Sequence, residues 1–228
     1  MTPLSLQEFL SREEALAGSD PVLTRLLVGI SEACKEISAK VREGALAGVL
    51  GLAGSENVQG EEQKKLDIIS NDIFVEAVAR TGAVCGMVSE EVPEPIAVPE
   101  ELPLGPYLAC FDPLDGSSNI DINVSIGSIF AILPAERPKR VPAPQDFLQP
   151  GRNLTAAGYC MYGPQTILAL TLGRGVFLFT LDDVTGTFRL TKENVRVPRE
   201  AKEFAINMSN QRFWEAPVVR YVSELLQG

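Results

Sequence analysis

The sequence predicts an α+β fold in which mixed α/β layers of helices and strands pack on one another. Apolar residues at helical spacing come first along the chain, and short apolar runs bounded by turn residues follow them. Helices that precede a set of mixed strands are typical of a layered architecture. The length of 228 residues allows one large domain, or one domain and part of another.

Helices are predicted in three places. A first helix is expected to begin at Asp20-Pro21, because Asp is a good N-cap and Pro suits the first helical position, and to end at Gly44. Ser70 is expected to cap a second helix, which Gly82 ends. A last amphipathic helix is predicted over residues 215–227.

Strands are predicted from apolar runs that lie between turn-forming residues. Two proline-rich stretches, residues 92–106 and 134–151, are expected to be irregular connections. The expected strands cover residues 83–88, 107–111, 124–133, 167–172, 176–181, 187–191 and 204–207.

Composition excludes several classes of function. The chain has 20 basic and 30 acidic residues, and its formal charge of −10 argues against binding to nucleic acid or to a membrane surface. It has no histidine, which excludes histidine-ligated zinc and Ser-His-Asp triads. Any acid, base or metal ligand must therefore come from carboxylates, Lys, Tyr, Cys, hydroxyl groups or water.

The cysteines indicate a reducing compartment. Cys34, Cys85, Cys110 and Cys160 form no CxxC pair and lie in apolar or mixed stretches, which favours buried free thiols over disulfides. The N-terminus lacks the basic and apolar regions of a secretion signal, and no segment has the length of a membrane span. We therefore expect a soluble cytoplasmic protein.

The segment from Phe111 to Asp121 is the strongest functional signal. It follows an apolar strand and contains three carboxylates and a Gly-Ser-Ser turn. A strand that ends in Asp-Pro-Leu-Asp brings two carboxylates and a backbone carbonyl to one point, and Mg²⁺ binds such oxygen clusters. The turn at residues 116–118 can direct backbone N–H groups toward an anion. Together these features suggest metal-assisted phosphoryl chemistry.

Two other acidic groups extend this pattern. One is Glu61-Glu62 with Asp67, and the other is Glu90-Glu91, which follows a predicted strand. Open sheets usually bind ligands beyond the carboxyl ends of their strands. Cations held between these groups would polarise a phosphoryl group, lower the pKa of a water and stabilise the leaving oxygen, while a spare carboxylate takes the proton of the water.

Each acidic group also has a plain structural interpretation. Glu61, Glu62 and the neighbouring lysines could form a solvated charged face. Glu90-Glu91 could be an exposed strand end, and Asp112 to Gly116 could be an ordinary turn, because Asp, Pro and Gly all favour turns. The spacing does not fit the calcium loop of an EF-hand.

Taken together, the motifs resemble those of class I fructose-1,6-bisphosphatases, and the resemblance spans essentially the whole chain. The turn Asp-Pro-Leu-Asp-Gly-Ser is shared with the wider lithium-sensitive phosphatase superfamily, which includes inositol monophosphatases. The continuation Ser-Asn-Ile-Asp and the later Gly-Ser-Ile-Phe are narrower and point to sugar bisphosphatases. The resemblance rests on residues 60–67 with 70–72, 89–91, 111–130, and 149–159 with 162–163.

The resemblance implies a magnesium centre with two or three Mg²⁺ per site, for which Mn²⁺ or Zn²⁺ could substitute. Glu90, Asp112, Asp115 and the Leu114 carbonyl resemble the metal ligands of the family. Glu61 would serve the outermost metal, where the family more often has Asp, and its longer side chain would shift that site.

The resemblance also implies the catalytic and substrate-binding residues. Glu91 and Asp67 resemble the pair that orients and deprotonates the attacking water. Backbone N–H groups of the turn would hold the 1-phosphate, and Asn207 would contact the 6-phosphate. The residues implied to bind substrate are Asp115, Gly116, Ser117, Ser118 and Asn207.

The implied fold is a layered α-β-α-β-α sugar-phosphatase sandwich with an incomplete second domain. Residues 1–198 would be the metal- and phosphate-binding domain, and 199–228 the start of a C-terminal sugar-phosphate domain. Family members continue well beyond a position like Gly228, so we expect a truncated chain with little activity of its own. Full-length members usually form homotetramers.

The implied function is Mg²⁺-dependent hydrolysis of the 1-phosphate of fructose 1,6-bisphosphate, in gluconeogenesis or carbon fixation. The partner is thus a small sugar bisphosphate. The alternatives are sedoheptulose 1,7-bisphosphatase or dual activity, and an inactive domain that acts as a binding or assembly partner. Inositol monophosphatase is a more distant alternative, which the Ser-Asn-Ile-Asp extension disfavours.

Overall fold

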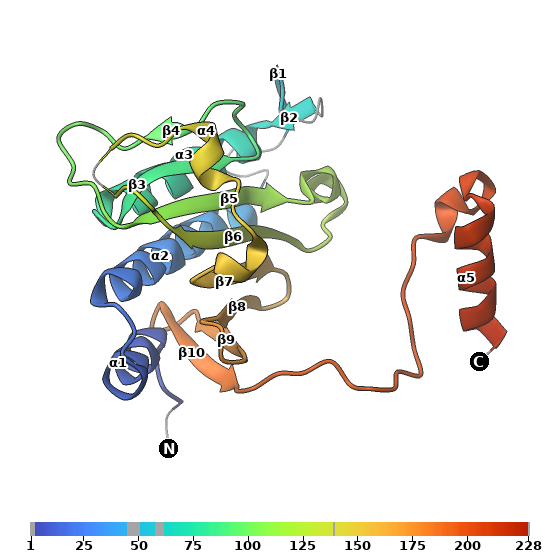
Figure 1. The fold of residues 1–228 in the computed structure, drawn as a ribbon. Helices are drawn as coiled ribbons and strands as arrows, with labels where there is room; N and C mark the ends of the chain where they lie inside the picture. Colours follow the sequence, from blue (N-terminus) through green and yellow to red (C-terminus); the bar gives the residue numbers. More distant parts are fainter. Residues whose placement is uncertain (1–2, 45–50, 58–61, 139, 228) are drawn as a thin grey trace. The chain divides into compact units, whose positions relative to one another are not determined.

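The chain forms two compact units, Met1–Val195 and Arg196–Gly228 (Figure 1). The computed structural model describes residues 3–227 except 45–50, 58–61 and 139. The division falls between residues 195 and 196, whereas the sequence predicts a boundary between 198 and 199. Each unit is described by itself below.

The first unit is built on a mixed sheet. Within the described residues this sheet has eight strands in the order β10-β9-β8-β7-β6-β5-β3-β4, and only β3 and β5 run parallel. The short strands β1 (Leu52–Glu56) and β2 (Glu62–Lys64) pair with each other outside it. The large sheet comprises β3 (Val84–Ser89), β4 (Ile96–Ala97), β5 (Tyr107–Asp115), β6 (Ile126–Pro134), β7 (Ala156–Tyr162), β8 (Thr166–Thr171), β9 (Val176–Asp182) and β10 (Thr187–Lys192).

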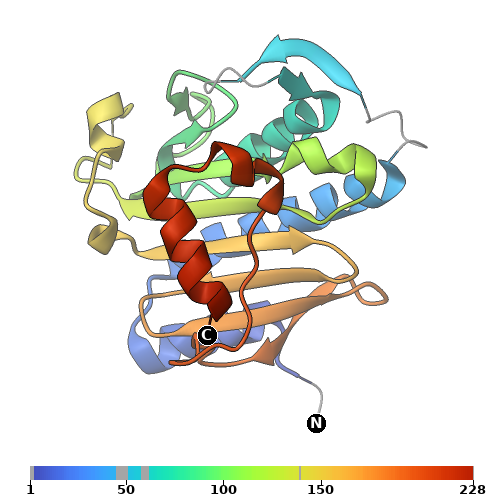
Figure 2. The ribbon, with the colours of Figure 1, turned by 90° about the vertical axis from the view of Figure 1, so that its right-hand side faces the viewer.

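Three long helices cover one face of this sheet, as Figure 2 shows. They are α1 (Leu6–Ala17), α2 (Pro21–Glu43) and α3 (Lys65–Arg80). The mixed α/β fold predicted from the sequence is therefore confirmed, with a layer of helices against a layer of strands. A short helix, α4 (Pro144–Phe147), interrupts the proline-rich connection after β6.

Helix α1 was not among the predicted elements, although its start carries a recognisable signal. Ser5 and Glu8 form a capping box, in which the Ser5 hydroxyl accepts from the Glu8 N–H at 3.2 Å and the Glu8 carboxylate accepts from the Ser5 N–H at 2.7 Å. The predicted helix from Asp20-Pro21 to Gly44 is confirmed as α2, with the Asp20 side chain accepting from the Val22 N–H.

Helix α3 begins five residues before the predicted cap, at Lys65 instead of after Ser70. Asp67 is the reason, because its Oδ2 accepts from the Lys64 N–H at 2.6 Å and satisfies a donor at the helix start. Ser70 is instead fully buried inside the helix. An aspartate predicted for catalysis therefore also holds the first turn of a core helix.

Two strand predictions failed in opposite directions. No strand was predicted over residues 152–166, yet β7 lies in the middle of the sheet, between β6 and β8. Its sequence contains Gly158, and glycine is unfavourable inside a strand. The strand predicted over residues 204–207 is wrong, because this exposed stretch pairs with none of the strands that the structure describes.

The second unit contains an irregular stretch at residues 196–207 followed by two helical segments. A 3₁₀ helix, η4 (Met208–Phe213), precedes α5 (Ala216–Gln227), which confirms the predicted C-terminal helix. Of the described helices in either unit, none combines the length and the apolar character that crossing a membrane requires.

Aromatic packing ties the helix layer to the sheet where the acidic residues lie. The ring of Phe74 on α3 packs on the ring of Phe111 on β5, with 4.7 Å between their centroids. Both side chains are buried. The helix that carries Asp67 is thus fixed against the strand that carries Asp112.

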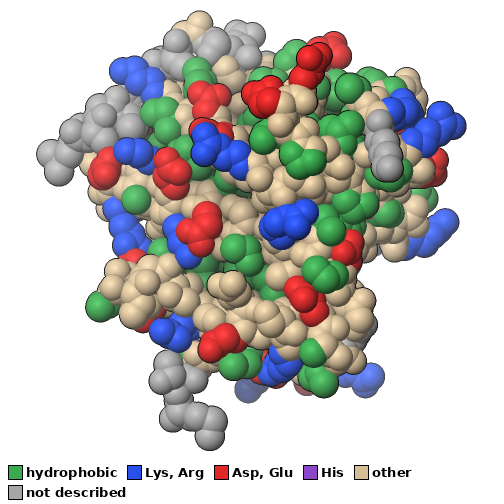
Figure 3. Space-filling view, turned by 90° about the vertical axis from the view of Figure 1, so that its left-hand side faces the viewer, with side chains coloured by type: hydrophobic (Ala, Val, Ile, Leu, Met, Phe, Trp, Pro, Cys, Tyr) green, Lys and Arg blue, Asp and Glu red, His purple; other side chains and the backbone are tan. Residues whose placement is uncertain are grey.

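On the face shown in Figure 3, which lies on the left-hand side of Figure 1, basic and acidic side chains are interspersed.

Candidate active site

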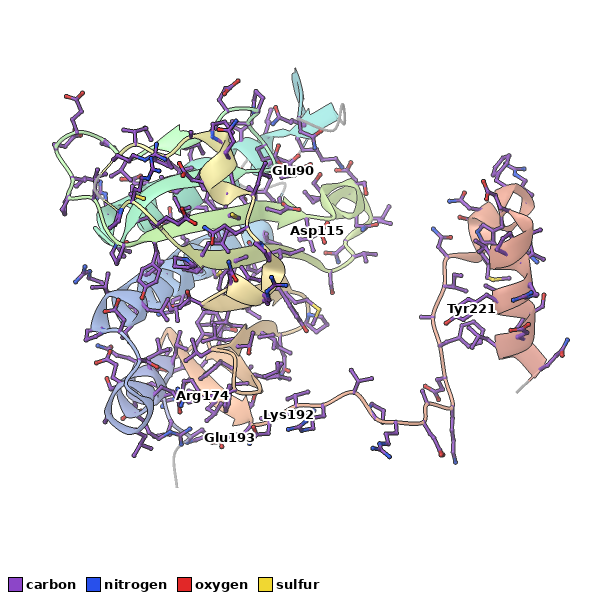
Figure 4. All side chains as sticks on the ribbon, viewed as in Figure 1. Glu90, Asp115, Arg174, Lys192, Glu193 and Tyr221 are labelled. Carbon is purple, nitrogen blue, oxygen red and sulfur yellow. The ribbon has the colours of Figure 1, made fainter. Side chains whose placement is uncertain are left out.

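The acidic residues meet because β3 and β5 run parallel and end at the same edge of the sheet. Ser89 at the end of β3 pairs with Phe111 of β5. The Glu90 N–H then donates to the Phe111 carbonyl at 3.1 Å, so the chain after β3 stays beside β5. In Figure 4, the labelled Glu90 and Asp115 lie at this common edge. Ligand sites of α/β sheets typically form at such carboxyl ends.

Strand β5 does not end at residue 111, as the sequence predicts, but continues through a β-bulge to Asp115. Asp112 pairs with Ile129 and Asp115 with Gly127, so residues 113 and 114 both face the single residue 128. A bulge of this kind bends the strand and redirects its side chains. Asp112 stabilises the bend, because its Oδ1 accepts from the Leu114 N–H at 3.0 Å.

Three carboxylates converge at this edge. Glu90, Glu91 and Asp112 each place one oxygen within 4.8 Å of the others. All three residues line a cavity of about 430 Å³. The cavity is lined by Asn57, Gln63, Lys64, Asp67, Glu90, Glu91, Asp112, Leu114, Asp115, Gly116, Ser117 and Ser118.

Neighbouring carboxylates raise the pKa of Glu91 and of Asp112, on top of the larger effect of burial. Burial is the largest cause for Glu91, followed among the raising effects by the charges of Asp67, Glu90 and Asp112, and its pKa rises to about 7. Burial and the neighbouring carboxylates likewise raise the pKa of Asp112 to about 6. Such a crowded set of hard oxygen donors fits Mg²⁺, which would remove the repulsion.

The raised pKa of Glu91 predicts an unusual pH dependence of stability in the metal-free chain. A carboxyl whose pKa is 4.5 when unfolded and about 7 when folded contributes stability below pH 4.5, and this is lost as the pH rises through 7. We expect the melting temperature of wild type, relative to Glu91→Gln, to fall between those pH values and then level off. Thermal melts in a chelator test this, and a flat difference curve would refute it.

Glu91 is held by two neighbours. The Gln63 side-chain amide donates to Glu91 Oε2 at 2.6 Å and to the Glu91 carbonyl at 3.2 Å. The Ser89 hydroxyl accepts from the Glu91 N–H at 3.2 Å and donates to the Asn71 side chain at 2.7 Å. Gln63 is buried, so the carboxylate has a defined direction toward the cavity.

Three of the residues lining the cavity were missed by sequence reasoning. Gln63 and Lys64 lie in a charged segment whose sequence fits a solvated face as well as a functional site. Asn57 lies in a loop that precedes this segment. Lys64 is held by Asp121, with 2.7 Å between Nζ and Oδ2. The signal that could have found Gln63 is its place just before an acidic helix start, which is a weak one.

The turn beside the carboxylates presents backbone N–H groups. Gly116 adopts a left-handed conformation with φ +83°, and the 3₁₀ helix η2 (Ser117–Ile122) begins directly after it. The first N–H groups of a helix have no acceptor inside the helix. The turn therefore offers donors to an anion next to a cluster of candidate metal ligands.

Gly116→Ala tests this turn. A Cβ would meet Asn119 Nδ2 only at 3.5 Å, so the cost is conformational, about 1 kcal/mol or somewhat more. Gly186→Ala is the matched control, since Gly186 also has positive φ (+63°) with open space around it. We expect similar losses of unfolding free energy in urea for both variants, but weaker binding of inorganic phosphate only for Gly116→Ala. Equal phosphate binding in the two variants would contradict the role of the turn.

Comparison with known proteins agrees with this geometry. A family model described as the N-terminal domain of fructose-1-6-bisphosphatase matches residues 5–193. The chain belongs to the fructose-1,6-bisphosphatase family. The holo-form crystal structure of Leishmania major fructose-1,6-bisphosphatase matches with a TM-score of 0.88 at 33% identity, covering 98% of this chain and 68% of that one. The apo form matches with a TM-score of 0.82 at 32% identity, covering 97% and 67%.

Most residues that the family resemblance implies lie together around the cavity. Asp67, Glu90, Glu91, Asp112, Leu114 and Asp115 line it with the turn at residues 116–118. Glu61 lies outside the described residues. Asn207 belongs to the second unit, where its side chain accepts from the Ser209 N–H at 3.0 Å and caps η4.

Proposed function

We propose that this member of the fructose-1,6-bisphosphatase family is a Mg²⁺-dependent phosphatase that hydrolyses the 1-phosphate of fructose 1,6-bisphosphate. The observation that carries the proposal is the convergence of Glu90, Glu91 and Asp112 beside the turn at residues 116–118, in one cavity. Candidate metal ligands and anion donors that share one cavity are what metal-assisted phosphoryl transfer requires. The similarity to Leishmania fructose-1,6-bisphosphatase supports the choice of reaction.

The metal ligands in this proposal are Glu90, Asp112, Asp115 and the Leu114 carbonyl, with Glu61 at an outer position. When bound, Mg²⁺ would polarise the phosphoryl group and offset the charge that develops on the leaving oxygen. Two or three ions would be needed to neutralise so many carboxylates, and Mn²⁺ or Zn²⁺ would serve in their place. Burial raises the pKa of Asp112 most, and the neighbouring carboxylates raise it further; bound cations would relieve this repulsion.

The chain's own residues orient the substrate and move the proton. The N–H groups of Gly116, Ser117 and Ser118 hold the 1-phosphate against the carboxylates, with Asp115 beside them. Glu91 accepts the proton of the attacking water, for which a pKa near the operating pH is suited. Asp67 helps to orient that water, and Asn207 contacts the 6-phosphate.

The test combines calorimetry with Mg²⁺ and the sugar bisphosphate with a phosphate-release assay. Binding of Mg²⁺ and weak Mg²⁺-dependent phosphate release from fructose 1,6-bisphosphate are the expected results. Binding of both ligands without turnover would favour the alternative of a binding or assembly domain. Failure to bind Mg²⁺ would overturn the proposed function.

A second candidate function is hydrolysis of sedoheptulose 1,7-bisphosphate, alone or alongside the first. Both activities should be assayed in parallel, because the described cavity would hold only the phosphate group and the metal ions. Hydrolysis of either substrate requires these same groups. Turnover of the two sugar bisphosphates, measured side by side, distinguishes these two functions.

The proposed compartment is the cytoplasm, where the four cysteines would remain the free thiols that they are in the structure. Homotetramer assembly of a full-length form is part of the same proposal.

A further inference from the structure

A side chain of β6 binds a backbone carbonyl within the β5 bulge. Pro113 and Leu114 both face Ser128 of β6, and a bulge interrupts the ladder at such a point. The Ser128 hydroxyl donates to the Pro113 carbonyl at 2.7 Å. Ser128 is fully buried, so water does not compete for this bond.

A tyrosine stands behind this serine. The hydroxyl groups of Ser128 and Tyr162 are 2.6 Å apart, and Tyr162 is buried at the end of β7. Because the single hydrogen of the Ser128 hydroxyl goes to the Pro113 carbonyl, Tyr162 is the donor of the second bond. Burial raises the pKa of Tyr162, which keeps that donor proton in place.

One peptide unit connects these hydroxyl groups to the acidic cluster. Its carbonyl belongs to Pro113 and accepts from Ser128, while its N–H belongs to Leu114 and donates to Asp112 Oδ1 at 3.0 Å. A peptide unit is planar, so fixing its carbonyl also fixes the direction of its N–H. The orientation of the Asp112 carboxylate therefore depends on a buried bond on the other side of the strand.

We propose that Ser128 and Tyr162 are positioning residues, which hold the peptide between Pro113 and Leu114 so that the Asp112 carboxylate and the Leu114 carbonyl are set for a divalent cation. This inference rests on the proposed function. Neither side chain lines the acidic cavity, and both act through the bulge. Mutation of a residue that orients a metal ligand through hydrogen bonds typically lowers the metal affinity 10- to 100-fold.

The test compares Ser128→Ala with Ser38→Ala, a matched control. Ser38 is also buried and also bonds a hydroxyl, that of Thr166 at 2.6 Å, on a helix that does not carry the acidic cluster. Free Mn²⁺ is measured by electron paramagnetic resonance, and amide hydrogen exchange at residues 114 and 115 is followed in the metal-free chain. For Ser128→Ala we expect Mn²⁺ binding about 10-fold weaker or more, and faster exchange at both amides. Ser38→Ala should change neither.

Two further variants keep the test decisive if Ser128→Ala folds poorly. Ser128→Thr retains the hydroxyl and should retain most of the Mn²⁺ affinity, while Tyr162→Phe should weaken it in the same direction but less. Equal Mn²⁺ affinity and exchange in wild type, Tyr162→Phe and Ser128→Ala would overturn the inference, as would equal losses in the Ser38→Ala control. Absence of Mn²⁺ binding in wild type would instead overturn the proposed function.

Discussion

Asp112→Asn should reduce kcat/KM for the sugar bisphosphate by about 1,000-fold, which corresponds to about 4 kcal/mol of lost transition-state stabilisation. Asp112 directly precedes the bulge, and one of its carboxylate oxygens lies within 4.8 Å of oxygens of Glu90 and Glu91. The amide of Asn can still accept from the Leu114 N–H, so the turn is kept while the ligand charge is lost. Calorimetry should show much weaker Mn²⁺ binding, and the assay should lose phosphate release.

The stability of this variant provides the critical control. Burial and neighbouring charges raise the pKa of Asp112 to about 6, so its ionised form is unfavourable in the folded metal-free chain. Asp112→Asn should therefore unfold in urea, at pH 8 with a chelator, at a concentration no lower than wild type. Asp72→Asn makes the same change at an exposed position and should leave Mn²⁺ binding unchanged. Normal Mn²⁺ affinity in Asp112→Asn would contradict the proposed site.

Glu91→Gln should lower kcat by about 100- to 10,000-fold with little change in KM, because a general base acts in the transition state. Gln is close in shape to Glu and can still accept from Gln63, so the local packing should persist. The pH profile of the residual activity should lose the limb that belongs to the base. Steady-state kinetics between pH 5.5 and 9, a range chosen around a pKa of about 7, provide the measurement.

Glu94→Gln is the matched control for this second variant. Glu94 is exposed three positions further along the same connection, and its replacement removes the same charge from the chain. Its kcat and pH profile should match those of wild type. If Glu91→Gln retained full kcat, or if both variants lost activity equally, Glu91 could not be the base.

The site was more predictable from the sequence than the architecture that builds it. The turn at residues 112–118 is local, and its chemistry follows from the residue types alone. Its bulge was not predicted, because a bulge depends on how Asp115 pairs with Gly127 on another strand. The contact between Ser128 and Tyr162 could likewise not be predicted. Nothing in the spacing of these residues indicates that their hydroxyl groups lie 2.6 Å apart.

The fold predictions failed where tertiary contacts override local patterns. Strand β7 lies between β6 and β8 although its sequence contains Gly158, because its ladder partners on both sides stabilise it. The predicted strand at residues 204–207 has apolar residues but pairs with none of the described strands. The sequence analysis grouped Asp67 with Glu61 and Glu62, and the family resemblance implied a catalytic role for it; only the structure reveals that it also accepts from the Lys64 N–H at the start of α3.

Anomalous diffraction from crystals of the chain grown with Mn²⁺ tests the central claim most directly. We predict anomalous peaks within coordination distance of the carboxylates of Glu90 and Asp112 and the carbonyl of Leu114, next to the N–H groups of residues 116–118. Peaks only at other acidic surface positions, with this cluster holding none, would contradict the account.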